Sequence, residues 1–325
     1  MERPRLSIAM CTYNGARYVL EELVDIAAQT RLPDELVVCD DGSTDGTIEI
    51  IESFVRHSRF AVRLEVNDKN LWCTKNFEKA IRMCHGEIIV LADQDDLWHP
   101  HKLNCMARVF ENEGIGAVFS DAWLIDENSQ LLPQKLWKSF FFNSREQEKF
   151  DRGQGLKVLL KHSAVTGATM AFRSKFRELA LPIPVKHIHD HWIALLIASV
   201  SQLAAIRTPL IRYRKHQAQL TGPGGGYNSL GQMVRIASVA RRDEYFREVE
   251  QFSEVHERLC ERSEAFRPHP NVLRLIGQKI DHRRARGSLP NSKFLRLPLL
   301  FREVVTQRYW RYSLGLGSFA KDLLV

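Results

Sequence analysis

Short apolar runs alternate with amphipathic segments through the N-terminal part of the chain. The apolar runs are rich in Val, Ile and Leu, which is typical of buried strands, and the segments between them have apolar residues at helical spacing. The strands expected from this pattern are 6–13, the start of 35–47, 62–68 and 87–96, and the helices are 16–30, 47–57 and 76–86. Strands this apolar, separated by helices, predict a mainly parallel sheet covered on both faces.

The pattern changes twice further along the chain. Residues 116–132 read as strand, turn and strand, and a helix is expected within 186–200. From residue 227 the chain has long amphipathic helical character. We therefore expect an α/β domain over residues 1–226 and a helical, basic C-terminal extension over residues 227–325.

Charge modifies this picture only at the C-terminal end. The whole chain carries a formal net charge of +7, and residues 265–325 hold 12 Lys and Arg against 3 Asp and Glu, a net of +9, which leaves −2 for the rest. A nearly neutral main body does not suggest nucleic-acid binding. The basic tail is interleaved with Leu, Phe, Trp and Tyr. It either lies on an anionic membrane surface or forms a helical cap with a solvated basic face.

Composition also bears on the compartment. No window reaches the roughly 18 consecutive apolar residues of a membrane-spanning helix, and no signal-peptide core follows the N-terminus. The 6 cysteines show no zinc spacing and several fall in apolar runs, which favours reduced core thiols. These features predict a cytoplasmic protein.

Two acidic clusters lie where predicted strands end. Asp40 and Asp41 close the second strand, and Asp93, Asp95 and Asp96 follow the fourth. Ligands bind at the carboxyl ends of strands in open α/β sheets, and carboxylates two residues apart suit Mg²⁺ or Mn²⁺ together with substrate phosphates. The Asp-x-Asp pair thus indicates a metal–diphosphate clamp. The alternative is that these aspartates are helix N-caps and solvated loop charges.

Several short motifs occur in a fixed order between residues 6 and 222. They are TYNG (12–15), DDGSTDGT (40–47), NLWCTKNF (70–77), DQDDLW (93–98), HDHW (189–192) and YRKHQAQLTG (213–222). Together they resemble the family 2 glycosyltransferases, inverting enzymes with the GT-A fold, and most of all their bacterial polysaccharide branch, which includes rhamnosyltransferases. The resemblance implies a GT-A-like α/β domain in which residues to about 120 bind the nucleotide sugar and residues 121–226 bind the acceptor.

The resemblance also implies which residues bind the nucleotide-sugar donor. They are Thr12, Tyr13, Asn14, Asp41, Asn70, Asp93 and Gln94. Thr12 and Tyr13 stand where the family packs the nucleotide base, and Asp41 matches the aspartate that accepts a hydrogen bond from the pyrimidine imide N–H. Asp40 and Asp45 can equally be turn and cap residues, so they rank below Asp41.

Metal and base roles follow from the same resemblance. Asp93 matches the nucleotide-facing aspartate and Asp95 the direct metal ligand. His216 matches the histidine that completes the metal shell or contacts the diphosphate. Asp190 matches the base that takes the proton of the acceptor hydroxyl. The alternative roles are a helix N-terminal carboxylate for Asp190 and a surface residue near a loop for His216.

Other residues of these motifs have more than one interpretation. His189 and His191 can be pocket walls, acceptor contacts or surface residues. Arg212 and Arg214 alternate on a strand-like segment and are candidates for phosphate binding. Trp72 stands where members of the branch often have Gly; we expect it to be packed rather than to serve as a platform for a sugar.

The sequence therefore predicts a metal-dependent inverting glycosyltransferase that uses Mg²⁺ or Mn²⁺. Its donor would be a nucleotide sugar such as dTDP-rhamnose or a UDP-sugar, and its acceptor a hydroxyl of a growing bacterial surface glycan or a lipid-linked saccharide, in the cytoplasm or on the inner face of the cell membrane. A sugar nucleotidyltransferase is the competing enzyme, but it needs a Gly-rich basic phosphate loop that the N-terminal region lacks. A non-catalytic nucleotide-sugar-binding protein is the other alternative, and Asp93, Asp95, Asp190 and His216 argue against it.

Overall fold

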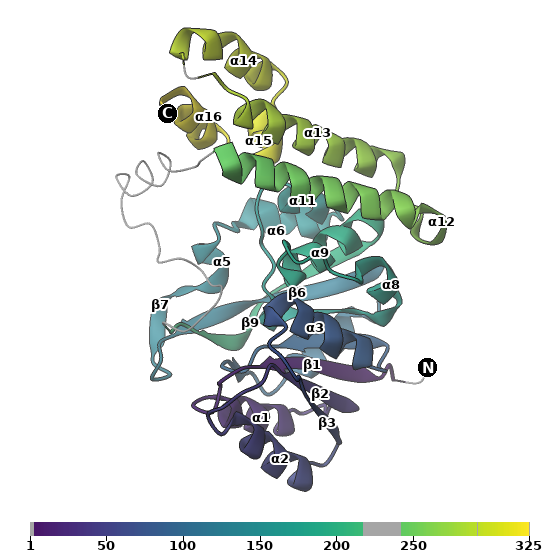
Figure 1. The fold of residues 1–325 in the computed structure, drawn as a ribbon. Coiled ribbons are helices and arrows are strands. Elements are labelled where there is room, and N and C mark those ends of the chain that lie inside the picture. The colour runs from purple at the N-terminus through teal and green to yellow at the C-terminus, as the bar shows by residue number, and fades with distance from the viewer. Residues whose placement is uncertain (1–2, 217–241, 291, 325) are drawn as a thin grey trace. The chain divides into compact units, whose positions relative to one another are not determined.

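A computed structural model describes residues 3–216, 242–290 and 292–324 (Figure 1). The described chain divides into two compact units. The first contains residues 3–153 and 164–216, and the second contains residues 154–163 and the described part of 242–324.

The first unit is built on a mixed sheet that has 9 strands among the described residues, with β3-β2-β1-β4-β8-β6-β9-β5 as its order and β7 paired with β6. The strands are β1 (Leu6–Thr12), β2 (Glu35–Asp40), β3 (Ala61–Val66), β4 (Ile88–Ala92), β5 (Leu97–Trp98), β6 (Ile115–Ile125), β7 (Leu131–Lys135), β8 (Met170–Arg173) and β9 (Gln202–Arg214). The helices of this unit are α1 (Val19–Ala27), α2 (Thr47–His57), α3 (Trp72–Met83), α4 (Lys102–Val109), α5 (Leu136–Ser139), α6 (Ser144–Asp151), α8 (Arg177–Ala180), α9 (His189–Val200) and the 3₁₀ turns η1 (Gly167–Thr169) and η2 (Ser174–Phe176).

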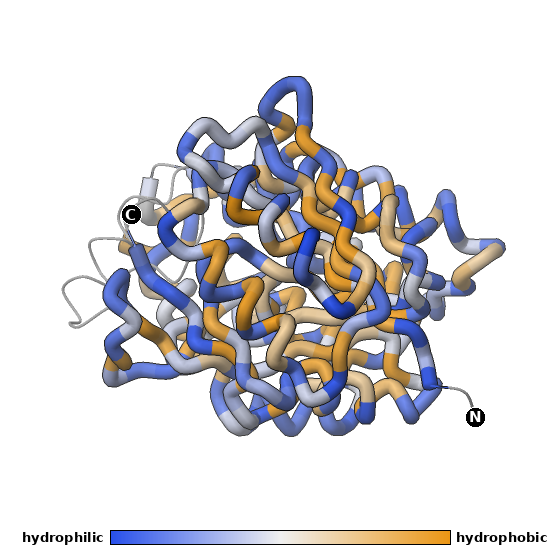
Figure 2. The backbone as a smooth tube through the Cα atoms, turned by 90° about the horizontal axis from the view of Figure 1, so that it is seen from below, coloured by the Kyte–Doolittle hydropathy of each residue, from blue (hydrophilic) through white to orange (hydrophobic). Residues whose placement is uncertain are grey.

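The β3-β2-β1-β4 half of the sheet is parallel, as the apolar runs predicted. Its central positions, such as Ile8, Val38 and Val90, are buried because helices cover both faces. Figure 1 shows α1 and α2 on one side of these strands and α3 on the other. In Figure 2, hydrophobic segments of the backbone run through the middle of the view, while hydrophilic segments lie mostly at its margin.

The other half of the sheet is mixed, which the sequence did not predict. Strand β8 is antiparallel to both β4 and β6, and β9 is parallel to β6. The far end of β9 also pairs antiparallel with the short strand β5, with Leu97 opposite Arg212. This last pairing carries the end of β9 to the loop that contains Asp95 and Asp96.

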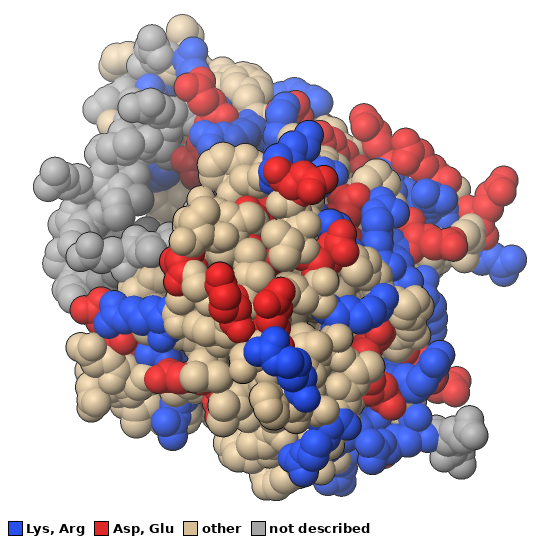
Figure 3. Space-filling model, turned by 60° about the horizontal axis from the view of Figure 1, so that its bottom comes forward, with Lys and Arg blue, Asp and Glu red and all other residues tan. Residues whose placement is uncertain are grey.

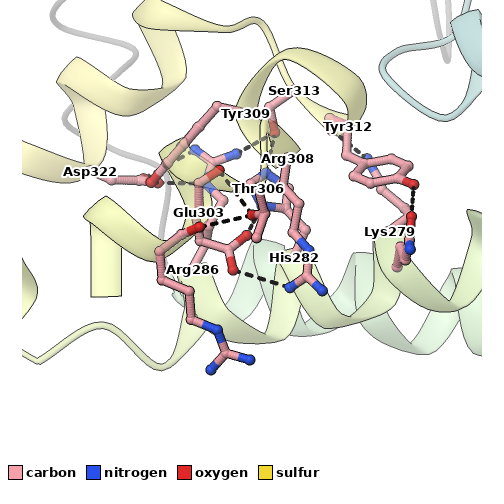
Figure 4. A network of polar contacts seen from close by, with 12 residues as sticks. Lys279, His282, Arg286, Glu303, Thr306, Arg308, Tyr309, Tyr312, Ser313 and Asp322 are labelled. Carbon is pink, nitrogen blue, oxygen red and sulfur yellow. Dashed lines mark hydrogen bonds and ion pairs between the residues drawn. The ribbon is translucent and has the colours of Figure 1, made fainter. Parts of the chain in front are cut away.

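The second unit is helical, as predicted. Its helices are α7 (Gly155–Leu159), α11 (Arg242–Glu261), α12 (Ser263–Phe266), α13 (Pro270–Gly287), α14 (Lys293–Val305), α15 (Arg308–Tyr312) and α16 (Leu316–Leu324). Polar side chains form a buried network among α13 to α16 (Figure 4). In it Arg286 pairs with Asp322, and His282 lies 2.5 Å from Glu303. Burial lowers the pKa of His282 to about 4.

This network changes the interpretation of the basic tail. Four of its cations, Lys279, Arg283, Arg286 and Arg296, are buried. Lys279 and Arg283 both pair with Glu248 of α11, so they serve the internal packing of the unit. Only part of the positive surplus of residues 265–325 is therefore available to a partner.

Three global expectations can be compared with the described residues. Among them, no helix combines the length and the apolar character needed to cross a membrane. All 6 cysteines are free thiols, and of these Cys39 and Cys84 are buried. On the face shown in Figure 3, basic side chains are interspersed with acidic ones rather than gathered into one patch.

Candidate active site

The loops that follow β1 and β2 are joined by polar side chains. Thr12 Oγ1 donates a hydrogen bond of 2.6 Å to Asp40 Oδ2. Asp40 also accepts from the backbone N–H groups of Gly42 and Ser43 and is completely buried. Asp40 thus shapes the turn after β2, and its bonds are to residues of that turn and to Thr12.

A second set of bonds fixes the backbone at Tyr13. The Gln94 side-chain amide donates to Tyr13 O at 3.0 Å and accepts from Tyr13 N at 2.8 Å. Asn14 Oδ1 accepts from Thr44 N. Gly15 makes this arrangement possible, because a Cβ there would lie 2.2 Å from Gln94 Oε1. The ring of Tyr13 is left about half exposed, 48%, at the carboxyl edge of the parallel strands.

Asp41 organises the loop between β3 and α3. Its Oδ1 accepts from Asn67 Nδ2 at 2.8 Å and from Leu71 N at 2.7 Å, and its Oδ2 accepts from Trp72 N at 2.9 Å. Asn70 Oδ1 accepts from the same Trp72 N–H. A carboxylate oxygen can accept two hydrogen bonds, so Oδ2 retains one position for a further donor such as an imide N–H.

The expectation that Trp72 is packed is wrong. Its side chain is 70% exposed, and its backbone has a φ of +64°. This left-handed conformation suits the Gly that the branch often has at this position, because Gly carries no Cβ. A bulky residue there is an outlier.

Asp95 and His216 are in direct contact, although 121 positions separate them in the sequence. His216 Nε2 lies 2.7 Å from Asp95 Oδ2, and both side chains are mostly buried. The β5–β9 pairing brings the two segments together. Arg214 strengthens the junction, because its Nε donates to Asp95 O at 2.7 Å.

Arg214 does not offer a free guanidinium to phosphate. Besides the bond to Asp95 O, it donates to Ser129 Oγ and pairs with Glu21 at 2.8 Å, and the side chain is buried. Its role is to hold protein groups together. Arg212 is exposed on the same strand.

Acidic side chains converge at this edge of the sheet. Burial, followed by the charges of Asp95 and Asp190, raises the pKa of Asp93 to about 7. The carboxylate of Asp190 is therefore close enough to Asp93 to act on it electrostatically. The structure thus brings the predicted base to the predicted metal and donor loop.

Asp96 is neither a helix cap nor a solvated charge. It is buried, and its Oδ1 accepts from Arg214 N at 2.9 Å, while its own N–H donates to the buried Glu22. Lys102 lies in the same buried group, and burial lowers its pKa to about 7. Lys102 Nζ donates to Ala168 O at 2.8 Å. Glu22, Asp96 and Lys102 thus form a buried polar group that holds the Asp-x-Asp loop on the interior side.

The residues present fit a divalent cation. Among the described residues no three His, Cys, Asp or Glu side chains form a ready metal cluster, but Asp95 and His216 present a carboxylate and an imidazole side by side. Mg²⁺ and Mn²⁺ sites that act on nucleotides use few protein ligands and take the rest from phosphate oxygens and water. A cation at Asp95 would also offset the repulsion that Asp95 exerts on Asp93.

Asp190 lies in the first turn of α9 and is held in place by backbone donors. Its Oδ2 accepts from Gly167 N at 2.8 Å and its Oδ1 from His191 N. The neighbouring His189 is buried and stacks on Phe77 with ring centroids 3.9 Å apart. His189 is thus packed in the interior, which excludes the surface role that its position left open.

The structure places two further residues near the acidic side chains of the candidate site, Tyr213 and Cys73, which the sequence analysis did not predict. Tyr213 is buried, and burial is the main cause that raises the pKa of its phenol. The charges of four nearby aspartates add to this effect: Asp93, Asp96, Asp95 and Asp190. The thiol of Cys73 also has a raised pKa, from burial and then from Asp93, Asp190 and Asp41. Alternation along the strand could have found Tyr213, because it points to the face opposite Arg212.

The fold and this site define the GT-A type of α/β enzyme. A family model described as "Glycosyl transferase family 2" matches residues 7–179, more than half of the chain. The chain therefore belongs to glycosyl transferase family 2. The family predicted from the motifs is confirmed; its rhamnosyltransferase branch stays a prediction.

The chain is also similar in sequence to curated proteins. An uncharacterized glycosyltransferase of Nostoc sp. is 26% identical over 220 residues, which cover 66% of this chain and 66% of the relative. The chain thus spans slightly less than two thirds of that relative's length. Chondroitin synthase of Escherichia coli is 30% identical over 131 residues, 40% of this chain and 19% of that protein.

Solved structures show the same fold. S. aureus TarS in complex with UDP-GlcNAc has a TM-score of 0.54 at 16% identity, covering 98% of this chain and 89% of that one. The mannosyltransferase PcManGT from Pyrobaculum calidifontis, in complex with GDP-Man and Mn²⁺, has a TM-score of 0.52 at 18% identity, covering 99% and 86%. At these identities the likeness shows the fold alone, and it confirms the predicted GT-A-like class.

Proposed function

We propose that this chain is a metal-dependent, inverting glycosyltransferase that moves a sugar from a nucleotide-sugar donor to a hydroxyl of a surface glycan or lipid-linked saccharide. The donor class is a dTDP- or UDP-sugar. The observation that carries the proposal is the 2.7 Å contact between Asp95 and His216. It places a carboxylate and an imidazole at the carboxyl edge of the strands, beside Asp93, where a diphosphate would meet a cation.

The protein side chains would divide the work as follows. Tyr13 and Asp41 would bind the base, because one presents a half-exposed ring and the other a free acceptor position. Asp95 and His216 would hold Mg²⁺ or Mn²⁺, which when bound neutralises charge on the departing nucleoside diphosphate. Asp190, fixed by two backbone N–H groups, would take the proton from the acceptor hydroxyl.

Two observations support this division of work. UDP-GlcNAc is bound in the TarS structure, and GDP-Man with Mn²⁺ in that of PcManGT. In this chain Tyr13, Asp41 and Asp95 follow β1, β2 and β4 at the carboxyl edge of the sheet. His216 contacts Asp95, and the charge of Asp190 acts on Asp93. Such an edge is where open α/β sheets bind ligands.

Mass spectrometry of donor turnover tests the proposal. The full chain is incubated with a panel of dTDP-, UDP- and GDP-sugars, lipid-linked saccharide acceptors, and Mn²⁺ or Mg²⁺. We expect one donor to be consumed and the acceptor to gain the mass of one sugar residue, only when metal is present.

Three other outcomes would contradict the proposal. Sugar transfer that persists in EDTA would show that the reaction does not require a metal ion. Consumption of a nucleoside triphosphate with a sugar 1-phosphate, releasing pyrophosphate, would indicate a nucleotidyltransferase. Binding of nucleotide sugars with no turnover under any condition would indicate a non-catalytic protein.

We further propose that the C-terminal unit binds an anionic membrane surface. Helix α14 exposes large apolar side chains that a solvated helix would not need: Phe294 is 85%, Leu295 65% and Phe301 68% exposed. Arg302 and Arg311 are exposed as well. Apolar insertion and attraction of arginines to anionic lipid, about 1 kcal/mol per basic residue near the surface, would act together.

Vesicle sedimentation of the full chain tests this second proposal. The wild type should sediment with phosphatidylglycerol-containing vesicles at low salt, less at high salt, and little with pure phosphatidylcholine. The double substitution Phe294→Asp with Leu295→Asp should lose this binding, because both side chains are exposed and their replacement does not disturb a core.

A matched control uses an equally exposed apolar residue of the first unit. Leu131→Asp changes a side chain that is 61% exposed and should leave sedimentation unchanged. Equal sedimentation of the double variant and the wild type, or none by the wild type, would return α14 to the role of a helical cap.

A further inference from the structure

Trp72 combines two properties that rarely occur together. It is a bulky residue in the left-handed region, with a φ of +64°, and its indole is 70% exposed at the start of α3. Gly would adopt this backbone conformation without strain. Since the indole is not used to fill a core, packing does not explain why a strained tryptophan stands here.

The backbone around Trp72 is held from several sides. Its N–H donates to Asp41 Oδ2 at 2.9 Å and to Asn70 Oδ1 at 2.8 Å. The preceding Leu71 N donates to Asp41 Oδ1 at 2.7 Å. Strained conformations persist where the surrounding structure over-determines them, and such positions cluster at ligand-binding sites. The loop therefore presents the indole to solvent from a fixed backbone.

Trp72 lies between the loop that contains Asp41, proposed to bind the donor, and the segment before Asp190, proposed to act on the acceptor. On one side it is bonded to Asp41, the proposed partner of the base. On the other side, the residues that follow it contact the segment before Asp190. Thr74 Oγ1 donates to His187 O at 2.8 Å, and Cys73 Sγ lies 3.8 Å from His189 Nδ1.

We propose that the indole of Trp72 is a carbohydrate-stacking platform at the rim of the active site. The apolar C–H face of a pyranose ring would pack on the indole, and its Nε1–H can donate to a sugar hydroxyl. This inference rests on the proposed function, and the pyranose is that of the donor or that of the acceptor. The nucleotide base does not require Trp72, because Tyr13 presents a ring on its side of the site.

Calorimetric titration and transfer kinetics with the full chain and Mn²⁺ test the platform. If the donor sugar stacks on it, Trp72→Ala should weaken binding of the nucleotide sugar by about threefold to tenfold and leave binding of the free nucleoside diphosphate unchanged. If the acceptor stacks on it, the KM for acceptor should rise by that factor with kcat and donor affinity unchanged. Trp72→Tyr should restore most of the loss in either case.

Two further variants separate recognition from folding. Trp72→Gly relieves the positive φ, so its thermal midpoint should equal or exceed that of the wild type, while its loss of sugar binding should match that of Trp72→Ala. Phe141→Ala is the matched control: Phe141 is also aromatic, 49% exposed and at a φ of +58°, but belongs to the loop after α5. It should change neither affinity nor KM.

The platform is overturned if Trp72→Ala and Trp72→Gly keep both donor affinity and acceptor KM within twofold of the wild type. It is also overturned if binding of the free diphosphate falls as much as binding of the nucleotide sugar, since the indole would then act on the nucleotide. Failure of the wild type to bind any nucleotide would instead contradict the proposed function, and the platform with it.

Discussion

Asp95→Ala is expected to reduce sugar transfer by about a hundredfold to a thousandfold and to remove the metal dependence of nucleotide binding. The substitution deletes the carboxylate that lies 2.7 Å from His216, so one of the two proposed metal ligands is lost. Initial rates of transfer, measured across a Mn²⁺ titration and after addition of EDTA, give both quantities.

The variant should remain folded. The charge of Asp95 acts to raise the pKa of both Asp93 and Asp96, so its removal relieves repulsion that offsets the lost contact with His216, and the thermal midpoint should change little. Glu113→Ala removes an equal charge from an exposed turn and should leave transfer unchanged. If Asp95→Ala transfers sugar at a near-normal rate and EDTA does not change that rate, the proposed metal–diphosphate clamp is wrong.

Asp190→Asn should lower transfer by on the order of a hundredfold or more with donor affinity nearly unchanged, because the amide keeps the size of the side chain and loses its basicity. The backbone N–H groups of Gly167 and His191 hold Asp190, while Tyr13 and Asp41 bond to other partners, so the substitution leaves the proposed base-binding residues in place. Steady-state rates combined with donor titrations separate the two effects.

The hydrogen bonds of Asp190 call for a second substitution. Both of its oxygens accept backbone N–H groups, from Gly167 and from His191, and an amide can accept at only one of them. Asp190→Glu keeps the basicity but displaces the carboxylate, so it should also transfer slowly while binding donor normally. A wild-type rate for Asp190→Asn would assign the base to another residue.

Local pattern was sufficient for the parallel half of the fold. The runs that form β1, β2 and β4 are apolar throughout because both faces of the sheet are covered, and the acidic residues follow directly where those strands end. The turn role suggested for Asp40 also agrees with local pattern, because its carboxylate accepts hydrogen bonds from Gly42 and Ser43 of its own turn.

Long-range pairing was beyond the reach of local pattern. Nothing near Ala92 in the sequence indicates that antiparallel β8 lies beside β4, or that the two-residue strand β5 pairs with the end of β9. The Asp95–His216 contact depends on that pairing, so it was predicted only through the family resemblance. The remainder of the motif after His216 lies outside the described residues.

Burial was the other quantity that sequence could not supply. A lone Trp in an apolar context is usually packed, but Trp72 has a left-handed backbone and an exposed indole. Conversely, Lys279 and Arg286 counted as surface charge until the structure showed Glu248 and Asp322 beside them. In both cases tertiary partners, rather than residue type, decide the exposure.

Isothermal titration of UDP, GDP and dTDP into the wild-type chain, first with Mn²⁺ and then with EDTA, tests most directly whether Asp95 and His216 hold a divalent cation against a donor diphosphate. At least one of the nucleotides should bind with Mn²⁺, lose most of its affinity in EDTA, and show no Mn²⁺ effect with Asp95→Ala. Binding that is equally tight in EDTA, or a Mn²⁺ effect that survives Asp95→Ala, would contradict the clamp.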